Sequence, residues 1–443
     1  MNFPISPLER KARQIALAAQ ERGGRAFLVG GYVRDELLQK KPKDADIEVY
    51  GIEADVLREL LSRLGRVDCV GESFRVYKLV WATTGEESGE KERHELDVSM
   101  PRRDKKTGAG HKGFEIEGDP FATIEDAARR RDFTVNALLK DPLTGEILDP
   151  SGGKSDLQNR VLRAVDGAHF GEDSLRVLRA MQFAARFEFT IDARTVQICR
   201  DTNLGDLPKE RVWAEWEKWL LKSEKPSLGL RAGRQIGVYA RLFPYLETAI
   251  ERRGSQIEAA LDGAAREKTG LPSEKQVALM LSVLGSFLGW RDTKRLLEDL
   301  NVQKMRGANG AFDVRTAIIQ LVGARKTPRD FYTRRGLVQD KDFRFFAARV
   351  EPDLALRLSR ARGDGEAAGW FEENLRRLNV FDGPPAPLLL GRHLLEMGMK
   401  PGPQIGKIVA HVYFLQLCGE VTSLENAKLA AQKMKREWEK QAE

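Results

Sequence analysis

The chain has 443 residues, of which 42% are hydrophobic, and it carries a formal net charge of +7 at pH 7. This length predicts several modules rather than one domain, and the apolar content is ample for buried cores. Three widely separated cysteines without metal-ligand spacing argue against a cysteine-ligated metal. The absence of a signal peptide and of a bilayer-length apolar run argues against a membrane protein, so we expect a cytoplasmic location.

Predicted strands and helices alternate in the first 150 residues, and helices dominate afterwards. Apolar periodicity predicts helices at 7–22, 33–38 and 53–64, and strands at 26–29, 47–50, 66–70, 74–82 and 95–100. The polar insert 83–93 predicts an exposed hairpin. From about residue 151 onward helical periodicity continues to the end. The predicted fold class is therefore α+β, a head with a mixed β-sheet and helices followed by an all-helical remainder.

An Asp-x-Asp pair, Asp44 and Asp46, follows a Gly-Gly turn by about one short helix. Strand alternation puts both carboxylates on one face, where they can hold one or two hard cations. Gly30 and Gly31 have no side chains to block a triphosphate from their backbone N–H groups, and Arg34 supplies a charge-assisted donor nearby. The pattern predicts nucleotidyl transfer assisted by Mg²⁺. The alternative is a solvated strand edge that carries two acids.

A third acid, Asp97, lies in a strand-like segment further along the chain. If that strand neighbours the one with Asp44 and Asp46, Asp97 can orient a metal or the attacking hydroxyl; otherwise it is a surface acid at a strand end. The basic, Gly-rich segment 101–114 predicts a mobile loop that suits a triphosphate or an RNA backbone, with a solvated charge run as the alternative.

The run Glu172-Asp173-x-x-Arg176-x-x-Arg179 predicts a helical face on which positions 173, 176 and 179 are neighbours. Cytosine and adenine both present an amine donor beside a ring-nitrogen acceptor. Asp173 can accept from the amine while Arg176 donates to the ring nitrogen, and uracil and guanine present the reverse pattern. The alternative is an N-terminal acid that stabilises its helix dipole. The tryptophans at 213, 216 and 219 are interpreted as core residues.

Five motifs, in this order, resemble those of the class II tRNA nucleotidyltransferase and bacterial poly(A) polymerase superfamily. They are GGYVRD at 30–35 with KDAD at 43–46, RRDFTVNA at 130–137, DP at 149–150 with DL at 156–157 and LR at 162–163, EDSLRVLR at 172–179, and ERVWAE at 210–215. The motifs cover roughly the first half of the chain. The resemblance implies a polymerase-β-like nucleotidyltransferase head at 1–150 and helical neck, body and tail domains at 151–225, 226–330 and 331–443.

The resemblance also implies an activity: template-independent addition of CCA to the 3′ end of tRNA from CTP and ATP, with Mg²⁺ as cofactor. The basic net charge agrees with such a polyanionic partner. Rival interpretations are an A-adding half-enzyme, a poly(A) polymerase and, from another class, a catalytically silent RNA-binding protein. The full-length 101–114 segment argues against an enzyme that adds only C, because relatives of that kind tend to have it shortened.

Further roles follow from the resemblance. Arg131 and Asp132, expected at the beginning of a helix after 123–128, would hold the sugar and phosphates, while Arg179 would join Asp173 and Arg176 in reading the base. The segment 149–162, with its two glycines, suits a hinge that moves when the enzyme switches from C to A. Some relatives carry an HD phosphohydrolase domain, and the absence of its His-Asp pair predicts no such activity here. The helical tail is expected to bind tRNA.

Overall fold

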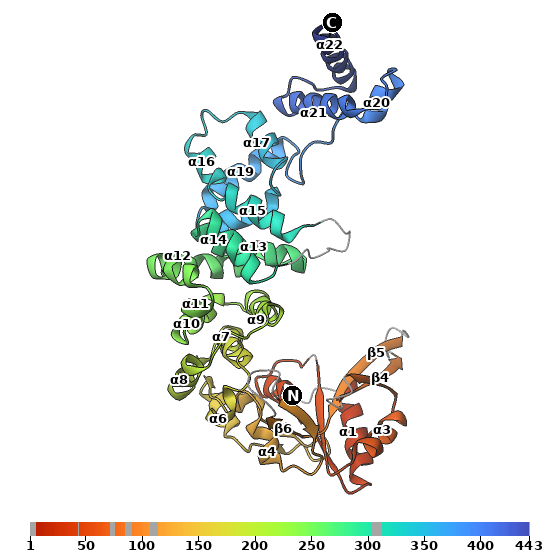
Figure 1. Ribbon diagram of the computed structural model, residues 1–443, viewed down its shortest axis with the longest axis vertical. Helices are drawn as coiled ribbons and strands as arrows, with labels where there is room; N and C mark the ends of the chain where they lie inside the picture. The colour runs from red at the N-terminus through yellow and green to blue at the C-terminus, as the bar shows by residue number, and fades with distance from the viewer. Residues whose placement is uncertain are drawn as a thin grey trace. The chain divides into compact units, whose positions relative to one another are not determined.

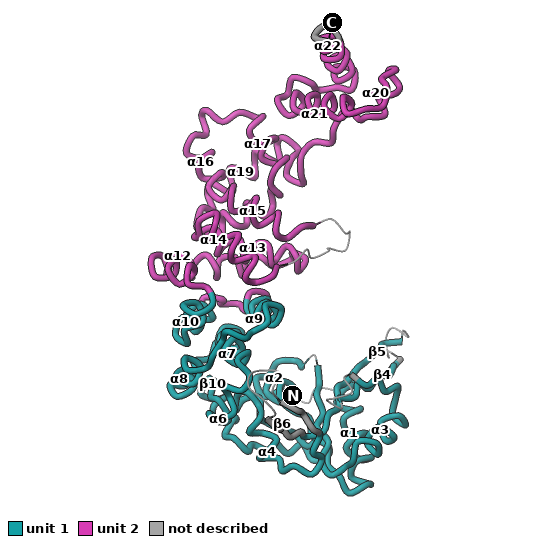
Figure 2. Tube along the Cα trace, in the orientation of Figure 1, with its two compact units in different colours: residues 1–219, 228–242 teal, residues 220–227, 243–443 magenta. Residues whose placement is uncertain are grey.

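The computed structural model describes residues 6–42, 44–70, 76–84, 91–106, 114–302 and 312–442. They divide into two compact units (Figures 1 and 2). Unit 1 comprises residues 1–219 and 228–242, and unit 2 comprises residues 220–227 and 243–443. The finer division into head, neck, body and tail stays a prediction.

A seven-stranded mixed sheet forms the core of the head, in the order β3-β4-β5-β2-β1-β8-β9. Its strands are β1 (Arg25–Val29), β2 (Asp46–Tyr50), β3 (Arg66–Val70), β4 (Val76–Thr84), β5 (Lys91–Ser99), β8 (Leu139–Lys140) and β9 (Ile147–Leu148). The pair β2 and β5 is parallel, and the other described neighbours in this sheet are antiparallel. The antiparallel pairing of β4 with β5 supports the hairpin predicted around 83–93, of which residues 85–90 lie outside the described residues.

Strand alternation decides what each face of the sheet buries. Ile47 and Val49 of β2 point into a core that they share with α1 (Pro7–Gln20) and α3 (Ala54–Ser62). Burial of each such side chain stabilises the folded state by roughly 1.5–3 kcal/mol relative to leaving it exposed. On the other face, Tyr50 packs with residues of β1 and of α4 (Ile124–Arg129). The same alternation places Asp46 and Glu48 on the face of Tyr50.

The segment predicted as a mobile loop at 101–114 is partly a β-ribbon. Strands β6 (Arg102–Lys106) and β7 (Phe114–Gly118) pair antiparallel, with Arg102 opposite Gly118 and Lys106 opposite Phe114. The backbone hydrogen bonds between β6 and β7 therefore replace the irregular backbone that was expected for this part of the segment. The prediction for the middle of the segment, 107–113, lies outside the described residues.

The rest of unit 1 is helical around one short parallel strand pair that the sequence did not indicate. The elements are α5 (Gly153–Gln158), β10 (Val161–Leu162), α6 (Gly167–Phe170), α7 (Leu175–Phe187), β11 (Thr190–Ile191), α8 (Ala193–Asp201), α9 (Lys209–Lys222), α10 (Pro226–Gln235) and α11 (Val238–Leu242). Trp216 and Trp219 are fully buried, with ring centroids 5.1 Å apart, which confirms their interpretation as core residues. Trp213 is half-buried.

Unit 2 is helical throughout its described residues. Its helices are α12 (Pro244–Glu267), α13 (Ser273–Phe287), α14 (Trp290–Asp299), α15 (Val314–Ala324), α16 (Thr327–Thr333), α17 (Asp340–Ala347), α18 (Pro352–Ala361), α19 (Gly365–Arg377), α20 (Gly391–Glu396), α21 (Pro403–Cys418) and α22 (Leu424–Ala442). Helices α12 and α18 approach closely at Gly263, where a Cβ would lie 2.6 Å from the Ala361 carbonyl oxygen.

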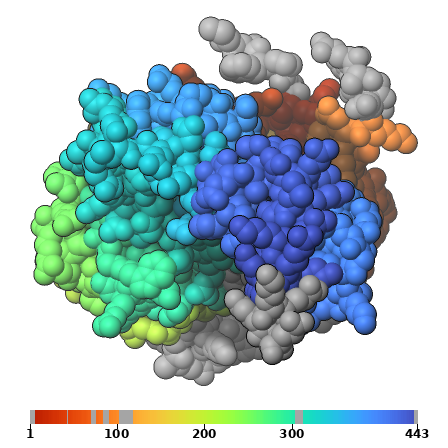
Figure 3. All heavy atoms as spheres, turned by 90° about the horizontal axis from the view of Figure 1, so that it is seen from above, coloured from red at the N-terminus to blue at the C-terminus, as the bar shows by residue number. Residues whose placement is uncertain are grey.

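The last three helices have a small core of their own. Leu394 of α20, Ile408 and Val412 of α21 and Ala427 of α22 are fully buried in it, and the dark blue atoms of the last two helices lie together in Figure 3. None of the described helices is both long and apolar enough to cross a membrane. The α+β class predicted from the sequence, a mixed-sheet head followed by helices, is confirmed.

Candidate active site

Two carboxylates meet where β2 and β5 run side by side. Asp46 is the first residue of β2, and it lies directly opposite Asp97 of β5 in the parallel register. The strand of Asp97 therefore does neighbour the strand of Asp46, the condition on which a role for Asp97 depends. Asp44 lies two residues before the strand and is exposed. Within the described residues, no group of three or more acidic, His or Cys side chains is close enough to hold a metal ion.

The electrostatics of Asp46 reflect this crowding of acids. Desolvation by the surrounding protein raises the pKa of Asp46, and the negative charges of Asp97 and Asp44 raise it further, while Arg131 lowers it. Lys78 of β4 lies 4.0 Å from Asp97, with its Nζ facing Oδ1, and it also pairs with Glu95 at 3.2 Å. A cation near the carboxylate pair would relieve the repulsion that raises this pKa.

The Gly-Gly turn lies between β1 and α2 (Gly31–Leu37). Gly30 has φ 62° and ψ −118°, a conformation that residues with a Cβ rarely adopt, and its N–H donates to the Leu138 carbonyl at 3.2 Å. A Cβ on Gly30 would lie 3.1 Å from Nη1 of Arg131. The fold thus brings the predicted phosphate turn and the RRD motif together.

Arg34 is buried, with 4% of its surface exposed, and its guanidinium has partners within the protein. Nε and Nη2 donate to Oδ1 of Asp35 at 2.8 and 2.6 Å, and Nη1 donates to Oδ1 of Asn136 at 2.5 Å. The guanidinium also lies 4.3 Å from the ring centroid of Phe187 in α7. Arg34 therefore links α2 to the RRD segment and to α7, and its predicted contact with a triphosphate stays a prediction.

Arg131 and Asp132 follow a helix instead of beginning one. Thr123 caps α4 by accepting from the Asp126 N–H at 3.1 Å, the helix ends at Arg129, and the backbone is extended at Phe133. The prediction that this pair begins a helix was therefore wrong, because the capping threonine starts α4 earlier. The loop after α4 turns both side chains inward.

Asp132 is held by donors from two sides. Its Oδ1 accepts from the Phe133 N–H at 2.8 Å and from Nδ2 of Asn136 at 2.9 Å, and its Oδ2 pairs with Arg179 of α7 at 2.6 Å. Burial opposes the charged carboxylate, but Arg179 and Asn136 outweigh it and lower the pKa of Asp132. This pair joins the second motif to the fourth.

Asp173 lies just before α7 and not on it. The helix begins at Leu175, whose N–H donates to Oδ1 of Asp173 at 3.2 Å, so the carboxylate caps the turn that opens the helix. The expectation that 173 shares a helical face with 176 and 179 was wrong for this reason. Asp173 also pairs with Arg211 of α9 at 3.3 Å, which links the fourth motif to the fifth.

Arg176 donates to two carbonyl oxygens, that of His169 at 2.8 Å and that of Arg130 at 2.5 Å. Burial lowers the pKa of its guanidinium. The three residues predicted to read the base thus lie at the same end of α7, but each is turned to a different partner. Their assignment to base recognition stays a prediction.

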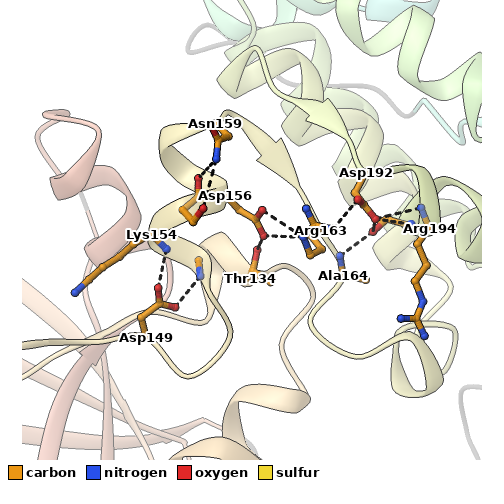
Figure 4. Close-up of polar contacts among 12 residues, drawn as sticks. Thr134, Asp149, Lys154, Asp156, Asn159, Arg163, Ala164, Asp192 and Arg194 are labelled. Carbon is orange, nitrogen blue, oxygen red and sulfur yellow. Dashed lines mark hydrogen bonds and ion pairs between the residues drawn. The ribbon is translucent and has the colours of Figure 1, made fainter.

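The segment predicted as a hinge is tied at both ends (Figure 4). Asp149 accepts from the N–H groups of Gly153 at 2.7 Å and Lys154 at 2.9 Å, which caps α5. Asp156 accepts from Oγ1 of Thr134 at 2.7 Å and from Nε of Arg163 at 3.1 Å. Arg163 continues through Nη1 to Asp192, the N-cap of α8, at 2.6 Å (Figure 4).

Two further residues of this site, Glu48 and Asn136, were not predicted from the sequence. Glu48 continues the alternation of Asp44 and Asp46 along β2, and that period of two was the signal that could have found it. Asn136 lies in the RRDFTVNA motif and bonds both Arg34 and Asp132. Its signal was weaker, because one amide in a motif does not indicate which side chains it will join.

Comparisons with protein families match two stretches in the first 250 residues of the chain. Residues 26–163 match the family described as poly A polymerase head domain, and residues 188–250 match the family described as probable RNA and SrmB-binding site of polymerase A. The multifunctional CCA proteins of Stenotrophomonas maltophilia (strain K279a) and Haemophilus ducreyi are 39% and 37% identical to the chain over 228 residues. These matches cover 50% of the chain and 52% and 51% of the two relatives. The chain thus spans about half the length of the curated relatives it matches.

Solved structures match over nearly the full chain. The crystal structure of the Bacillus stearothermophilus CCA-adding enzyme in complex with CTP has a TM-score of 0.67 at 21% identity and covers 99% of both chains. The Thermotoga maritima CCA-adding enzyme complexed with tRNA has a TM-score of 0.64 at 21% identity, covering 98% of this chain and 100% of the other. At this identity the likeness establishes a shared fold. The head-domain match shows that residues 26–163 belong to the poly A polymerase head domain family.

Proposed function

We propose that the chain is a template-independent CCA tRNA nucleotidyltransferase, which adds CCA to the 3′ end of tRNA from CTP and ATP. The observation that carries the proposal is the pairing of Asp46 with Asp97 on neighbouring parallel strands, in the same head as the Gly30 turn and Arg131. The names of the relatives, multifunctional CCA protein and CCA-adding enzyme with CTP, ATP or tRNA, support it. A cytoplasmic location follows from a tRNA substrate and stays a prediction.

The reaction needs little covalent chemistry from the protein. The oxygen of the RNA 3′-hydroxyl attacks the α-phosphorus of the nucleotide, the bond from that phosphorus to the oxygen bridging to the β-phosphate breaks, and pyrophosphate leaves. The hydroxyl proton passes to solvent or to a nearby base. Positioning and charge stabilisation therefore supply most of the rate.

The donor set fits a hard divalent cation. Asp44 and Asp46 supply carboxylate oxygens, the ligands that Mg²⁺ prefers, and the pKa of Asp46 is raised first by desolvation and then by the negative charges of Asp97 and Asp44. When bound, Mg²⁺ would stabilise charge on the phosphoryl oxygens and help to activate the 3′-hydroxyl. Asp97 would orient the metal or the attacking hydroxyl.

The remaining site residues would bind and orient the nucleotide. Gly31 and Arg34 are proposed for the triphosphate, and Arg131 and Asp132 for the sugar and phosphates. Asp173, Arg176 and Arg179 are proposed for the base. Because Arg34, Asp132 and Arg179 already have protein partners, nucleotide binding would have to exchange or share those hydrogen bonds.

A gel assay at single-nucleotide resolution tests the proposal. A tRNA transcript that lacks CCA is incubated with Mg²⁺ and CTP, ATP or both, beside a transcript that ends in CC. Two additions with CTP, a third only with both nucleotides, and then a stop are expected. Addition of one A only to the CC-ended transcript would indicate an A-adding half-enzyme, and a long ladder with ATP would indicate a poly(A) polymerase.

The rival from a different class is a catalytically silent RNA-binding protein, and Asp44→Ala separates the two. Asp44 is exposed, so the substitution should leave the fold and the RNA affinity intact. Incorporation should fall by at least about a thousandfold, the loss expected when a metal ligand is removed. Persistent incorporation by this variant would overturn the metal assignment.

A further inference from the structure

Strand β2 carries a row of three polar side chains, of which only the first has a role so far. Asp46, Glu48 and Tyr50 alternate with the buried Ile47 and Val49, so they share one face of the sheet. The Glu48 side chain is 12% exposed, and a carboxylate so far from water needs partners to stay charged.

Glu48 has two donors on the same oxygen. Its Oε2 accepts from the Tyr50 hydroxyl at 2.7 Å and from Nη2 of Arg131 at 3.2 Å. Tyr50 is 8% exposed, and its ring packs edge-on against Phe27 with centroids 5.7 Å apart. The tyrosine is thus fixed by the core, and it fixes the rotamer of Glu48 in turn.

Arg131 extends from Glu48 to the Gly-Gly turn. While Nη2 pairs with Glu48, Nη1 faces the Asn136 carbonyl at 3.5 Å and the place where a Cβ on Gly30 would lie, 3.1 Å away. The side chain keeps 22% of its surface exposed, so the guanidinium is oriented by the protein and still reaches solvent. A planar guanidinium whose two terminal nitrogens, Nη1 and Nη2, are both held is preorganised to bind phosphate oxygens.

We infer that Glu48 is a positioning residue for nucleotide binding: locked by Tyr50, it holds the Arg131 guanidinium at the Gly30 turn, ready for the phosphates of a nucleoside triphosphate. The inference rests on the proposed function, because Arg131 is a nucleotide ligand only if the chain transfers nucleotides. Glu48 acts through Arg131 and does not itself touch the substrate. Burial lowers the pKa of the Arg131 guanidinium, and the negative charge of Glu48 opposes that effect and raises it.

Substitution of Glu48 should change nucleotide affinity more than the rate of the chemical step. For Glu48→Ala we expect the KM for CTP on a transcript lacking CCA to rise about tenfold, with kcat within about threefold of wild type. Glu48→Gln keeps an acceptor oxygen without the charge, so its KM should lie between the KM of wild type and that of Glu48→Ala. Tyr50→Phe keeps the ring packing and loses only the hydroxyl, and we expect a rise of about two- to threefold.

A matched control is the Glu59 and Arg63 pair of α3, which is also a Glu–Arg contact in the head but is exposed at the surface. Glu59→Gln should leave the KM for CTP at the wild-type value, because exposed pairs contribute little. In an Arg131→Ala background, Glu48→Gln should add less than about a twofold further change in KM, since its effect passes through the arginine.

Three readouts separate this role from a purely structural one: the thermal unfolding midpoint, the change in KM compared with the change in kcat, and the effect of Glu48→Gln in the Arg131→Ala background. The thermal unfolding midpoint of each variant shows whether the head still folds. A lower unfolding midpoint together with a reduced kcat and an unchanged KM would overturn the inference. So would a rise in KM from Glu48→Gln that is as large in the Arg131→Ala background as in the wild type. If wild type incorporates nucleotides while Glu48→Ala keeps its KM, the inference fails and the proposed function stands. If wild type incorporates none, the proposed function fails first.

Discussion

At the scale of residues, the site is a set of charged side chains that compensate one another. Asp132 is paired with Arg179, Asp173 with Arg211, and Arg34 with Asp35. Buried or partly buried charges of this kind are stable only with such partners. Asp46 differs from Asp132, because desolvation and then the neighbouring acids raise the pKa of Asp46, whereas the pKa of Asp132 is lowered.

The raised pKa of Asp46 gives a pH prediction. Removing the charge of Asp97 with Asp97→Asn should lower the pKa of Asp46, so that Asp46 is deprotonated, and able to bind metal, at more acid pH. The acid limb of the incorporation rate should therefore move to lower pH by up to about one unit. The measurement is the pH profile of the single-turnover rate, and a limb that stays in place or moves to higher pH would contradict the prediction.

Asp132 gives a prediction about stability. Its folded-state pKa is below the ordinary value, so its ion pair stabilises the fold above the unfolded pKa and the contribution is lost as pH falls through the folded pKa. Asp132→Asn should lower the free energy of unfolding by about 2–4 kcal/mol at pH 7 and by much less near pH 3. Urea unfolding at both pH values measures this, and an equal loss at both would show that the charge is not responsible.

At the scale of elements, close backbone contacts decide how the 149–163 segment can move. Gly152 has φ 75°, so a proline there, which needs φ near −65°, would break the turn instead of stiffening it. Gly153 lies so near Thr134 that an added Cβ would be 2.2 Å from that carbonyl oxygen. Nothing lies within 4 Å of a Cβ on Gly152.

The two glycines therefore offer a matched pair of substitutions. Gly153→Ala should lower the free energy of unfolding by about 2–4 kcal/mol through the clash with Thr134, and Gly152→Ala by about 1 kcal/mol through its positive φ. If the segment is a hinge, the milder Gly152→Ala should slow addition of A more than addition of C. Equal slowing of both steps, in a gel assay with separate nucleotides, would argue against the hinge.

The sequence predicted the elements of the head well, because alternation and helical periodicity agree there with the final packing. Helix α1, strand β3 and the β4–β5 hairpin lie within a few residues of their predicted bounds. The sequence did not predict which charged side chains of the site pair with one another. That Asp132 would pair with Arg179, or Asp173 with Arg211, depends on how α7 and α9 pack against the loop after α4, and no spacing within one motif encodes that.

At the scale of the whole molecule, the basic composition predicts how the proposed binding of tRNA responds to salt. A chain with net charge +7 that neutralises several phosphates releases counterions on binding, so log K should fall linearly with log salt concentration. We expect a loss of at least about a hundredfold in tRNA affinity between 50 and 200 mM salt. Filter binding or anisotropy at several salt concentrations measures the slope. A slope near zero would contradict binding through the phosphate backbone.

The register of β2 against β5 has a consequence for how the protein folds. Asp46 and Asp97 are about fifty residues apart in the chain, and α3 and the β3–β4 pair lie between them. The chain must close this loop before the two carboxylates can meet, and such distant parallel pairing forms slowly. The contact between β2 and β5 that brings Asp46 opposite Asp97 should therefore form late in refolding, after the local antiparallel pairing of β3 with β4.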